Sequence, residues 1–175
     1  SVAQLPGGEI VPAMERGVID GFEFNNPTSD RRFGAQDVAK NYMMGSHHQA
    51  TEYFEIMFNK GKFDALPAEH KAILQYAAEA VSSANEWKAM DYYSKDLQEL
   101  ISKDKVNVVR TPKGVFDAQI KAWDGLIAQL GSDPFMKKVM DSQKAWVRRV
   151  VYYNMNNATD YRGAFDHHFP GVLKI

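Results

Sequence analysis

The sequence predicts an α/β fold, in which a first third of strands, loops and short helices precedes a mainly helical remainder. Along residues 18–24, and again along residues 52–59, successive side chains fall on two alternating faces, as they do in strands. From residue 67 onward, apolar or small residues instead recur in steps of three and four, which is the helical period. The length of 175 residues corresponds to about one domain.

Composition excludes several classes of function. The 21 Lys and Arg residues are balanced by 22 Asp and Glu residues, whereas a protein that binds nucleic acid usually has a basic excess. The chain contains no cysteine, so thiolate metal sites, cysteine nucleophiles and disulfides are excluded. The first six residues have neither an initiator methionine nor the features of a signal peptide, so we expect that the chain was cut from a longer one.

The first third is expected to begin with a short helix over residues 9–16, which Gly17 would close in the left-handed conformation. A strand over residues 18–24 should follow directly. Residues 25–30 are six consecutive turn-forming residues and predict a loop, after which Asp30 would cap a short helical turn. The strand-like run that ends near residue 59 should close in a charged turn.

A single long helix is expected over residues 67–103, because Pro67 occupies a favourable first position and no glycine or later proline interrupts the period. At 1.5 Å per residue it would be about 55 Å long, which is more than the width of a small domain. We therefore expect it to bridge separate parts of the protein. A short strand over residues 106–110 and a helix over residues 116–130 should follow.

The last helix should begin at Asp133-Pro134 and carry two neighbouring apolar stripes. One stripe includes Trp146 and Tyr153, and the other includes Val147 and Val151. Because both stripes cannot face one core, we expect the second to contact another copy of the chain. The basic character of this helix is better explained by a solvated face than by RNA or membrane contact.

Among the polar residues, Glu23 is the strongest candidate for ligand binding, because it ends a predicted strand just before a turn-rich loop. The alternative is an edge-strand carboxylate that faces solvent. His47 and His48 are adjacent and lack the spacing of a two-histidine metal site, so either one of them faces a ligand pocket or both are structural. No phosphate-loop, dinucleotide-binding, nucleophile-elbow or zinc-protease motif is present.

Residues 5–23, with the sequence LPGGEIVPAMERGVIDGFE, resemble the solute-binding proteins of tripartite ATP-independent periplasmic (TRAP) transporters, the DctP-like family. The resemblance extends through the junction at residues 58–67 to the C-terminal helices and covers essentially the whole chain. It implies the C-terminal portion of a periplasmic-binding-protein-like, type II-like fold, with a lobe-bridging helix and C-terminal dimerisation helices. The most similar branch is the dimeric one that binds 2-oxo acids.

The resemblance also implies a cation at the ligand site. In the family an acidic residue that matches Glu23 binds the cation together with the next backbone carbonyl, which here belongs to Phe24. Gln49 matches a family position that is often Glu and would be a third ligand. Carboxylate, carbonyl and amide oxygens suit a hard cation such as Na⁺ or Ca²⁺.

The remaining substrate contacts implied by the resemblance are an apolar wall from Phe24 and orienting hydrogen bonds from four polar residues, Asn25, Asn26, His47 and His48. The family often has aromatic residues where the two histidines stand here. The arginine that clamps the substrate carboxylate in the family belongs to the half that these 175 residues do not contain. No catalytic residue is expected.

We therefore expect residues 1–66 to be the sheet-containing part of the ligand-binding lobes. Residues 67–133 should supply the bridging helix, a short strand and a packing helix, and residues 134–175 the dimerising helix and tail. The expected protein is periplasmic, captures a small 2-oxo or 2-hydroxy carboxylate and delivers it to TRAP membrane permease subunits. Two alternatives are a metal-dependent enzyme domain that acts on an oxo acid and a helical oligomerisation module.

Overall fold

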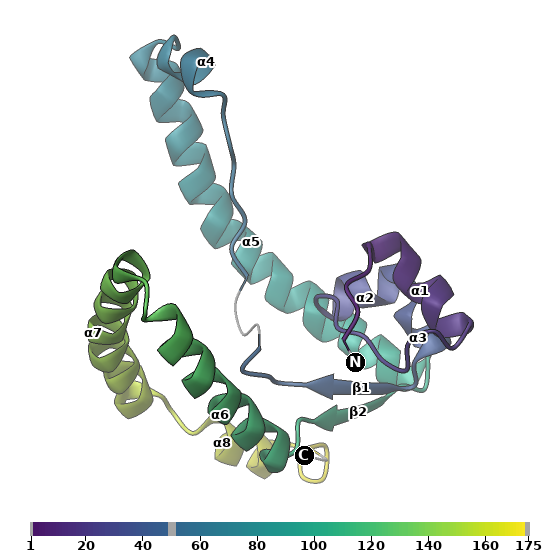
Figure 1. The fold of residues 1–175 in the computed structure, drawn as a ribbon. Coiled ribbons are helices and arrows are strands. Elements are labelled where there is room, and N and C mark those ends of the chain that lie inside the picture. Colours follow the sequence, from purple (N-terminus) through teal and green to yellow (C-terminus); the bar gives the residue numbers. More distant parts are fainter. Residues whose placement is uncertain (1, 49–51, 174–175) are drawn as a thin grey trace. The chain divides into compact units, whose positions relative to one another are not determined.

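The computed structural model describes residues 2–48 and 52–173, which form helices and one two-stranded sheet (Figure 1). The chain divides into two compact units. Unit 1 comprises residues 1–44 and 51–109, and unit 2 comprises residues 45–50 and 110–175. Each unit is described by itself.

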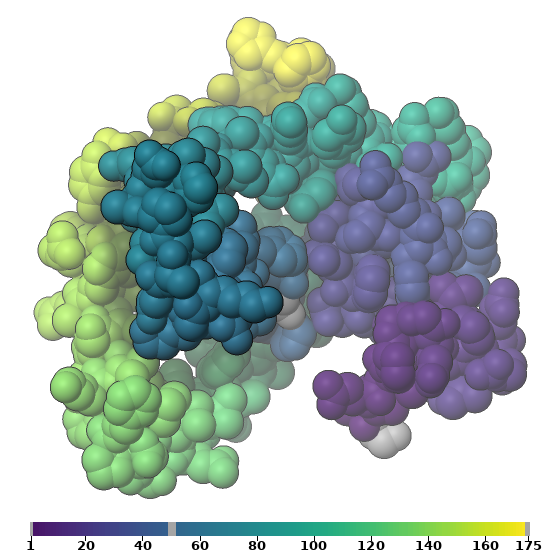
Figure 2. Space-filling model, turned by 90° about the horizontal axis from the view of Figure 1, so that it is seen from above, coloured from purple at the N-terminus to yellow at the C-terminus, as the bar shows by residue number. Residues whose placement is uncertain are grey.

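Unit 1 begins with α1 (Gly7–Glu15), close to the predicted range. The predicted role of Gly17 is confirmed, because it has a φ of 66° and its N–H donates to the carbonyl of Met14 at 3.0 Å. Ile10 and Ala13 form the buried face of this helix. In Figure 2, α1 and the following helices form one continuous group of purple and violet atoms.

The predicted strands over residues 18–24 and 52–59 are absent: neither range contains a strand in the part of the chain that the structure describes. A strand requires hydrogen bonds to a neighbouring strand, whereas alternation in the sequence indicates only which side chains share a face. The described residues supply no such neighbour for either range. In the second range the apolar side chains of Tyr53, Phe54 and Met57 are 80% to 87% exposed.

The predicted loop over residues 25–30 is also wrong, because most of it belongs to α2 (Pro27–Phe33). Asn26, and not Asp30, caps this helix: its side-chain oxygen accepts a hydrogen bond from the N–H of Ser29 at 3.0 Å. Asparagine, proline and serine favour helix N-termini as well as turns, which explains the error. Gly34, with a φ of 88°, separates α2 from α3 (Ala35–Val38).

The sheet consists of β1 (Asn41–Met44) and β2 (Asn107–Arg110), which confirms the predicted strand near residues 106–110. Both strands run in the same direction in Figure 1. The N–H of Asn107 donates to the carbonyl of Lys40 at 2.8 Å, which sets the register at the start of both strands. A long crossover joins them, as parallel strands require.

That crossover contains α4 (Lys60–Asp64), where a charged turn was predicted, and α5 (Ala68–Ser102). Helix α5 has 35 residues and confirms the predicted long helix almost to the residue. Leu100 is its buried residue, near its C-terminal end. The bridging of two lobes by this helix stays a prediction.

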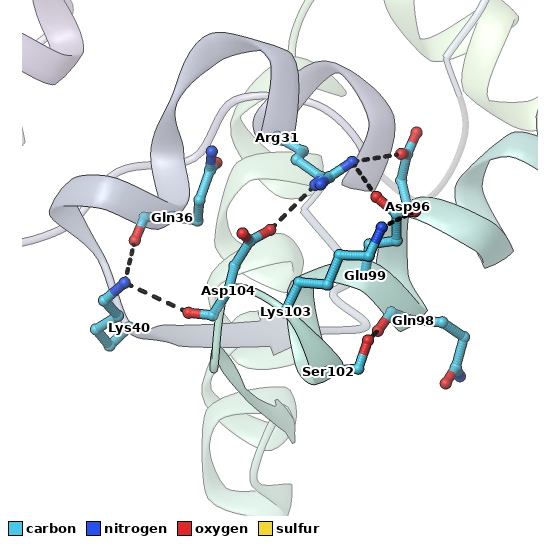
Figure 3. A network of polar contacts seen from close by, with 9 residues as sticks. All are labelled: Arg31, Gln36, Lys40, Asp96, Gln98, Glu99, Ser102, Lys103 and Asp104. Atoms are coloured by element: carbon cyan, nitrogen blue, oxygen red, sulfur yellow. Dashed lines mark hydrogen bonds and ion pairs between the residues drawn. The ribbon is translucent and has the colours of Figure 1, made fainter.

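A charge network fastens α2 to the end of α5 (Figure 3). The guanidinium of Arg31 contacts three carboxylates: Asp96 at 3.3 Å, Glu99 at 2.6 Å and Asp104 at 3.0 Å. The hydrogen bond to Asp104 raises the pKa of Arg31. Lys103 also contacts Glu99, at 2.7 Å, and this hydrogen bond lowers the pKa of Glu99. The network holds α2, and with it the residues just before α2, at a defined place on α5.

Unit 2 contains α6 (Lys113–Leu130), α7 (Pro134–Asn157) and α8 (Tyr161–His168). The predicted start of the last helix at Asp133-Pro134 is confirmed, because Asp133 caps α7 by accepting a hydrogen bond from the N–H of Met136 at 2.8 Å. Both predicted stripes of α7 are open to solvent: Trp146 is 56% and Val147 is 45% exposed. No helix among the described residues is both long and apolar enough to span a bilayer.

Candidate functional site

In unit 1, the segment before α2 is held by three phenylalanine rings. Phe24 stacks on Phe33 of α2, with ring centroids 4.4 Å apart and an interplanar angle of 13°. Phe22 contacts the same ring edge-on, at 6.3 Å between centroids. Because Phe22 and Phe24 both reach Phe33, the intervening Glu23 is placed on the other side of an extended backbone.

The carboxylate of Glu23 is exposed and makes no hydrogen bond or ion pair with the residues that the structure describes. The same holds for the backbone carbonyl of Phe24 in that part of the chain. Two oxygen donors of consecutive residues are thus available, and this donor set fits a hard cation. Gln49, the third predicted ligand, lies outside the described residues.

The structure gives the two asparagines different roles. Asn26 caps α2 through its oxygen, and its nitrogen donates to the side-chain oxygen of Asn25 at 2.9 Å. Asn26 is therefore largely engaged within the protein. The side-chain nitrogen of Asn25 keeps its donors for a ligand, whereas its backbone N–H donates to the Oδ1 atom of Asp30 at 3.1 Å.

Sequence reasoning missed the function of Asp30, which is only 6% exposed. Its second oxygen accepts a hydrogen bond from the Tyr42 hydroxyl of β1 at 2.7 Å. Burial raises the pKa of the Asp30 carboxyl, and this effect outweighs the hydrogen bonds, which lower it. Burial and the bond to Asp30 raise the pKa of the Tyr42 phenol as well. An aspartate in the first turn of a helix is common, so the sequence carries no specific signal for this pair.

In unit 2, the backbone at residues 45–48 is held against α6 by Gln119. The Oε1 atom of Gln119 accepts the N–H of His47 at 3.1 Å, and its Nε2 atom donates to Ser46 at 2.8 Å. The hydroxyl of Ser46 in turn accepts the N–H of His48 at 3.0 Å. This glutamine was not identified from the sequence, because its partners lie more than 70 residues away in the chain.

The two histidines themselves are exposed. The ring of His47 lies edge-on to Phe116, at 5.0 Å between centroids, and the indole N–H of Trp123 donates to the carbonyl of His47 at 3.2 Å. His47 is thus packed on α6 on one side. The choice between a ligand contact and a structural role for either histidine stays a prediction.

Neither unit gathers a metal site from charged side chains alone: the described residues contain no group of three or more His, Asp or Glu side chains suited to a metal ion. The site predicted at Glu23 combines one carboxylate with carbonyl and amide oxygens. Arg31 follows this segment closely in the sequence, but its guanidinium is occupied by three carboxylates. It is therefore committed to the fold and not to a substrate.

Known proteins with similar sequences are solute-binding proteins. Residues 1–131 match the family described as bacterial extracellular solute-binding protein, family 7. Over 163 residues, the chain is 26% identical to a monocarboxylate 2-oxoacid-binding periplasmic protein of Nostoc sp. (strain PCC 7120). The match covers 92% of this chain and 44% of the Nostoc protein.

A solved structure has the same fold: the TRAP periplasmic solute-binding protein of Pseudoalteromonas atlantica T6c, with bound sodium and pyruvate. Its TM-score is 0.73 at 24% identity, and the match covers 95% of this chain and 50% of that one. The chain thus spans about half the length of the proteins it matches. Since the family match extends over residues 1–131, the chain belongs to family 7 of the bacterial extracellular solute-binding proteins, the DctP family.

Proposed function

We propose that this chain is the C-terminal part of the periplasmic solute-binding subunit of a TRAP transporter, and that the whole subunit captures a 2-oxo or 2-hydroxy monocarboxylate together with a cation. The family match over residues 1–131 carries this proposal. It is supported by the 2-oxoacid-binding name of the Nostoc relative and by the sodium and pyruvate bound in the Pseudoalteromonas structure. TRAP membrane permease subunits would receive the bound acid.

The proposed cation ligands are the Glu23 carboxylate, the Phe24 carbonyl and the Gln49 side chain. Both oxygen donors at Glu23 and Phe24 are unengaged by the described part of the chain, which supports this assignment. Sodium is preferred over calcium because the Pseudoalteromonas structure holds sodium. When bound, the cation would neutralise the repulsion between Glu23 and the substrate carboxylate.

The substrate contacts proposed for this chain are an apolar wall and a few orienting donors. Phe24 would form the wall, since its ring is fixed by stacking on Phe33 and remains 36% exposed. The amide of Asn25, with one of the histidines 47 and 48, would donate hydrogen bonds to substrate oxygens. Asn26 would contribute mainly by holding Asn25.

A direct test is calorimetric titration of the full-length protein, by which we mean a protein of the relatives' length that carries these 175 residues. Pyruvate and lactate should bind in sodium chloride and bind at least tenfold more weakly when choline replaces sodium. Calcium is tested as a separate arm. Because the family binds solutes, the ligand should be recovered chemically unchanged. Absence of binding to any 2-oxo or 2-hydroxy acid would refute the proposed function.

A homodimer held by residues 134–175 is also proposed. Its support is the exposure of both apolar stripes of α7, with Trp146 at 56% in one stripe and Val147 at 45% in the other. The 175-residue chain should have the mass of a dimer in light scattering at micromolar concentration, and truncation after Gly131 should give a monomer. A monomeric mass for the untruncated chain would contradict the prediction.

A further inference from the structure

We propose that Asp30 and Tyr42 are positioning residues for cation binding: through the N–H of Asn25 they set the direction of the Phe24 carbonyl. This inference rests on the proposed function, because it concerns the same ligand segment. It concerns the buried Asp30 and the half-buried Tyr42, neither of which belongs to the ligand set proposed for the cation.

The geometric argument begins with the peptide bond between Phe24 and Asn25. This bond is planar and trans, since no cis peptide bond occurs among the described residues. In a trans peptide the C=O and N–H groups point in opposite directions. The hydrogen bond from the Asn25 N–H to Asp30, at 3.1 Å, therefore also determines where the Phe24 carbonyl oxygen points. That oxygen is directed away from Asp30.

The same hydrogen bond affects the strength of the carbonyl as a ligand. Asp30 presents a carboxylate to the N–H end of the peptide group, which polarises the group and increases the negative charge on the carbonyl oxygen. Asp30 is 6% exposed, so water screens this effect only weakly. A carbonyl polarised in this way binds a cation more strongly than one whose N–H is bonded to water.

Asp30 is itself held from two sides. Its Oδ2 atom accepts the Tyr42 hydroxyl at 2.7 Å, which connects it to β1, and its own N–H donates to the carbonyl of Asn26 at 2.8 Å. The next residue, Arg31, anchors α2 to α5 through its three carboxylates. The position of the Asn25 N–H is thus fixed by contacts to a helix and a strand of unit 1, and not by the loop alone.

The experiment compares variants of the full-length protein in pyruvate titrations at several sodium concentrations. In Asp30→Ala the hydrogen bond is lost, and the apparent sodium affinity should fall about tenfold. In Asp30→Asn the amide oxygen still accepts the Asn25 N–H, and its NH₂ group can donate to the Tyr42 oxygen. This variant should therefore recover the part of the affinity that depends on the direction of the Phe24 carbonyl, and the remaining loss should reflect the missing negative charge. Tyr42→Phe should give an intermediate loss, about threefold.

Val106→Ala is the matched control for stability, because it removes buried apolar surface from unit 1 without touching these hydrogen bonds. It should lower the melting temperature and leave sodium affinity unchanged. A second readout is hydrogen exchange at the Asn25 amide, which should be faster in Asp30→Ala and close to wild type in Asp30→Asn. Exchange at this single amide reports on the bond and not on global stability.

The possible outcomes distinguish failure of the proposed function from failure of the positioning role. If the wild-type protein binds no 2-oxo acid, the proposed function fails, and the positioning role fails with it. If the wild type binds in a sodium-dependent way but Asp30→Ala and Val106→Ala lose the same affinity for the same loss of melting temperature, only the positioning role is overturned. Should Asp30→Ala fail to fold, an unchanged sodium affinity in Tyr42→Phe, with unchanged exchange at Asn25, would overturn it equally.

Discussion

Replacing Glu23 by alanine is expected to abolish the sodium dependence of pyruvate binding in the full-length protein. Glu23 supplies the only anionic side chain of the proposed cation ligand set. Its carboxylate is exposed and unpaired among the described residues, so no internal ion pair would compensate for its loss. Removal of one charged interaction of this kind should weaken pyruvate binding by about one to two orders of magnitude. Titration calorimetry with and without sodium measures both effects.

Glu15→Ala is the matched control, because Glu15 is an exposed glutamate of α1 outside the ligand segment. It changes the net charge of the protein by the same amount and should leave binding unaltered. Glu23→Asp should retain part of the sodium response, since it keeps the charge. The assignment of Glu23 would be refuted by a Glu23→Ala protein whose pyruvate affinity responds to sodium as the wild type does.

The second large effect concerns the 175-residue chain on its own, which should bind pyruvate orders of magnitude more weakly than the full-length protein. A carboxylate is commonly bound by arginine, and each such charge-assisted hydrogen bond contributes about 1.5 to 3 kcal/mol. Arg31, the partly exposed arginine nearest to the proposed site in the sequence, already binds Asp96, Glu99 and Asp104. A second lobe that closes over the ligand would also be missing.

Parallel titrations of the two proteins under one buffer check this expectation. Circular dichroism should first establish that the shorter chain is folded, with the helix content of α5 to α7 present. Equal pyruvate affinity in the two proteins would show that the determinants of binding lie within these 175 residues and that the proposed site is misplaced.

The helical part of the fold was predictable because helices depend on local sequence. The long helix is expected over residues 67–103 and observed at Ala68–Ser102, and Gly17 closes α1 as its conformational freedom suggests. Two of the three predicted strands are wrong, because residues 18–24 and 52–59 have the right alternation but no partner among the described residues, whereas residues 107–110 pair with β1. The loop prediction for residues 25–30 is wrong for a different reason, because the same residue types favour turns and capped helix N-termini.

Residues of the candidate site likewise differ in whether local sequence or tertiary contacts determine their role. The sequence favours Glu23 as the end of a strand that leads into a loop, but the structure has no strand over residues 18–24 and a helix from Pro27. Glu23 stays a candidate because its carboxylate is exposed and unpaired among the described residues. Asp30 could not be identified from the sequence, because its role depends on a hydrogen bond from Tyr42 of β1. This contact forms only when α2 and β1 come together in the folded chain. The same reason explains why Gln119 was not identified, since the residues 46 and 47 that it contacts lie more than 70 positions away in the sequence.

The network around Arg31 has a consequence for how this protein can vary. One cation serves three carboxylates, so the loss of Asp96, Glu99 or Asp104 alone leaves Arg31 with two partners. The loss of Arg31, in contrast, leaves three negative charges close together, with Lys103 bound to Glu99 and Lys40 bound to the Asp104 carbonyl. Substitutions should therefore accumulate singly at the three acidic positions during evolution while position 31 stays basic. The carboxylates can therefore replace one another in this contact, whereas the arginine has no substitute among the described residues, and α2 should keep its place on α5 when a single carboxylate is lost.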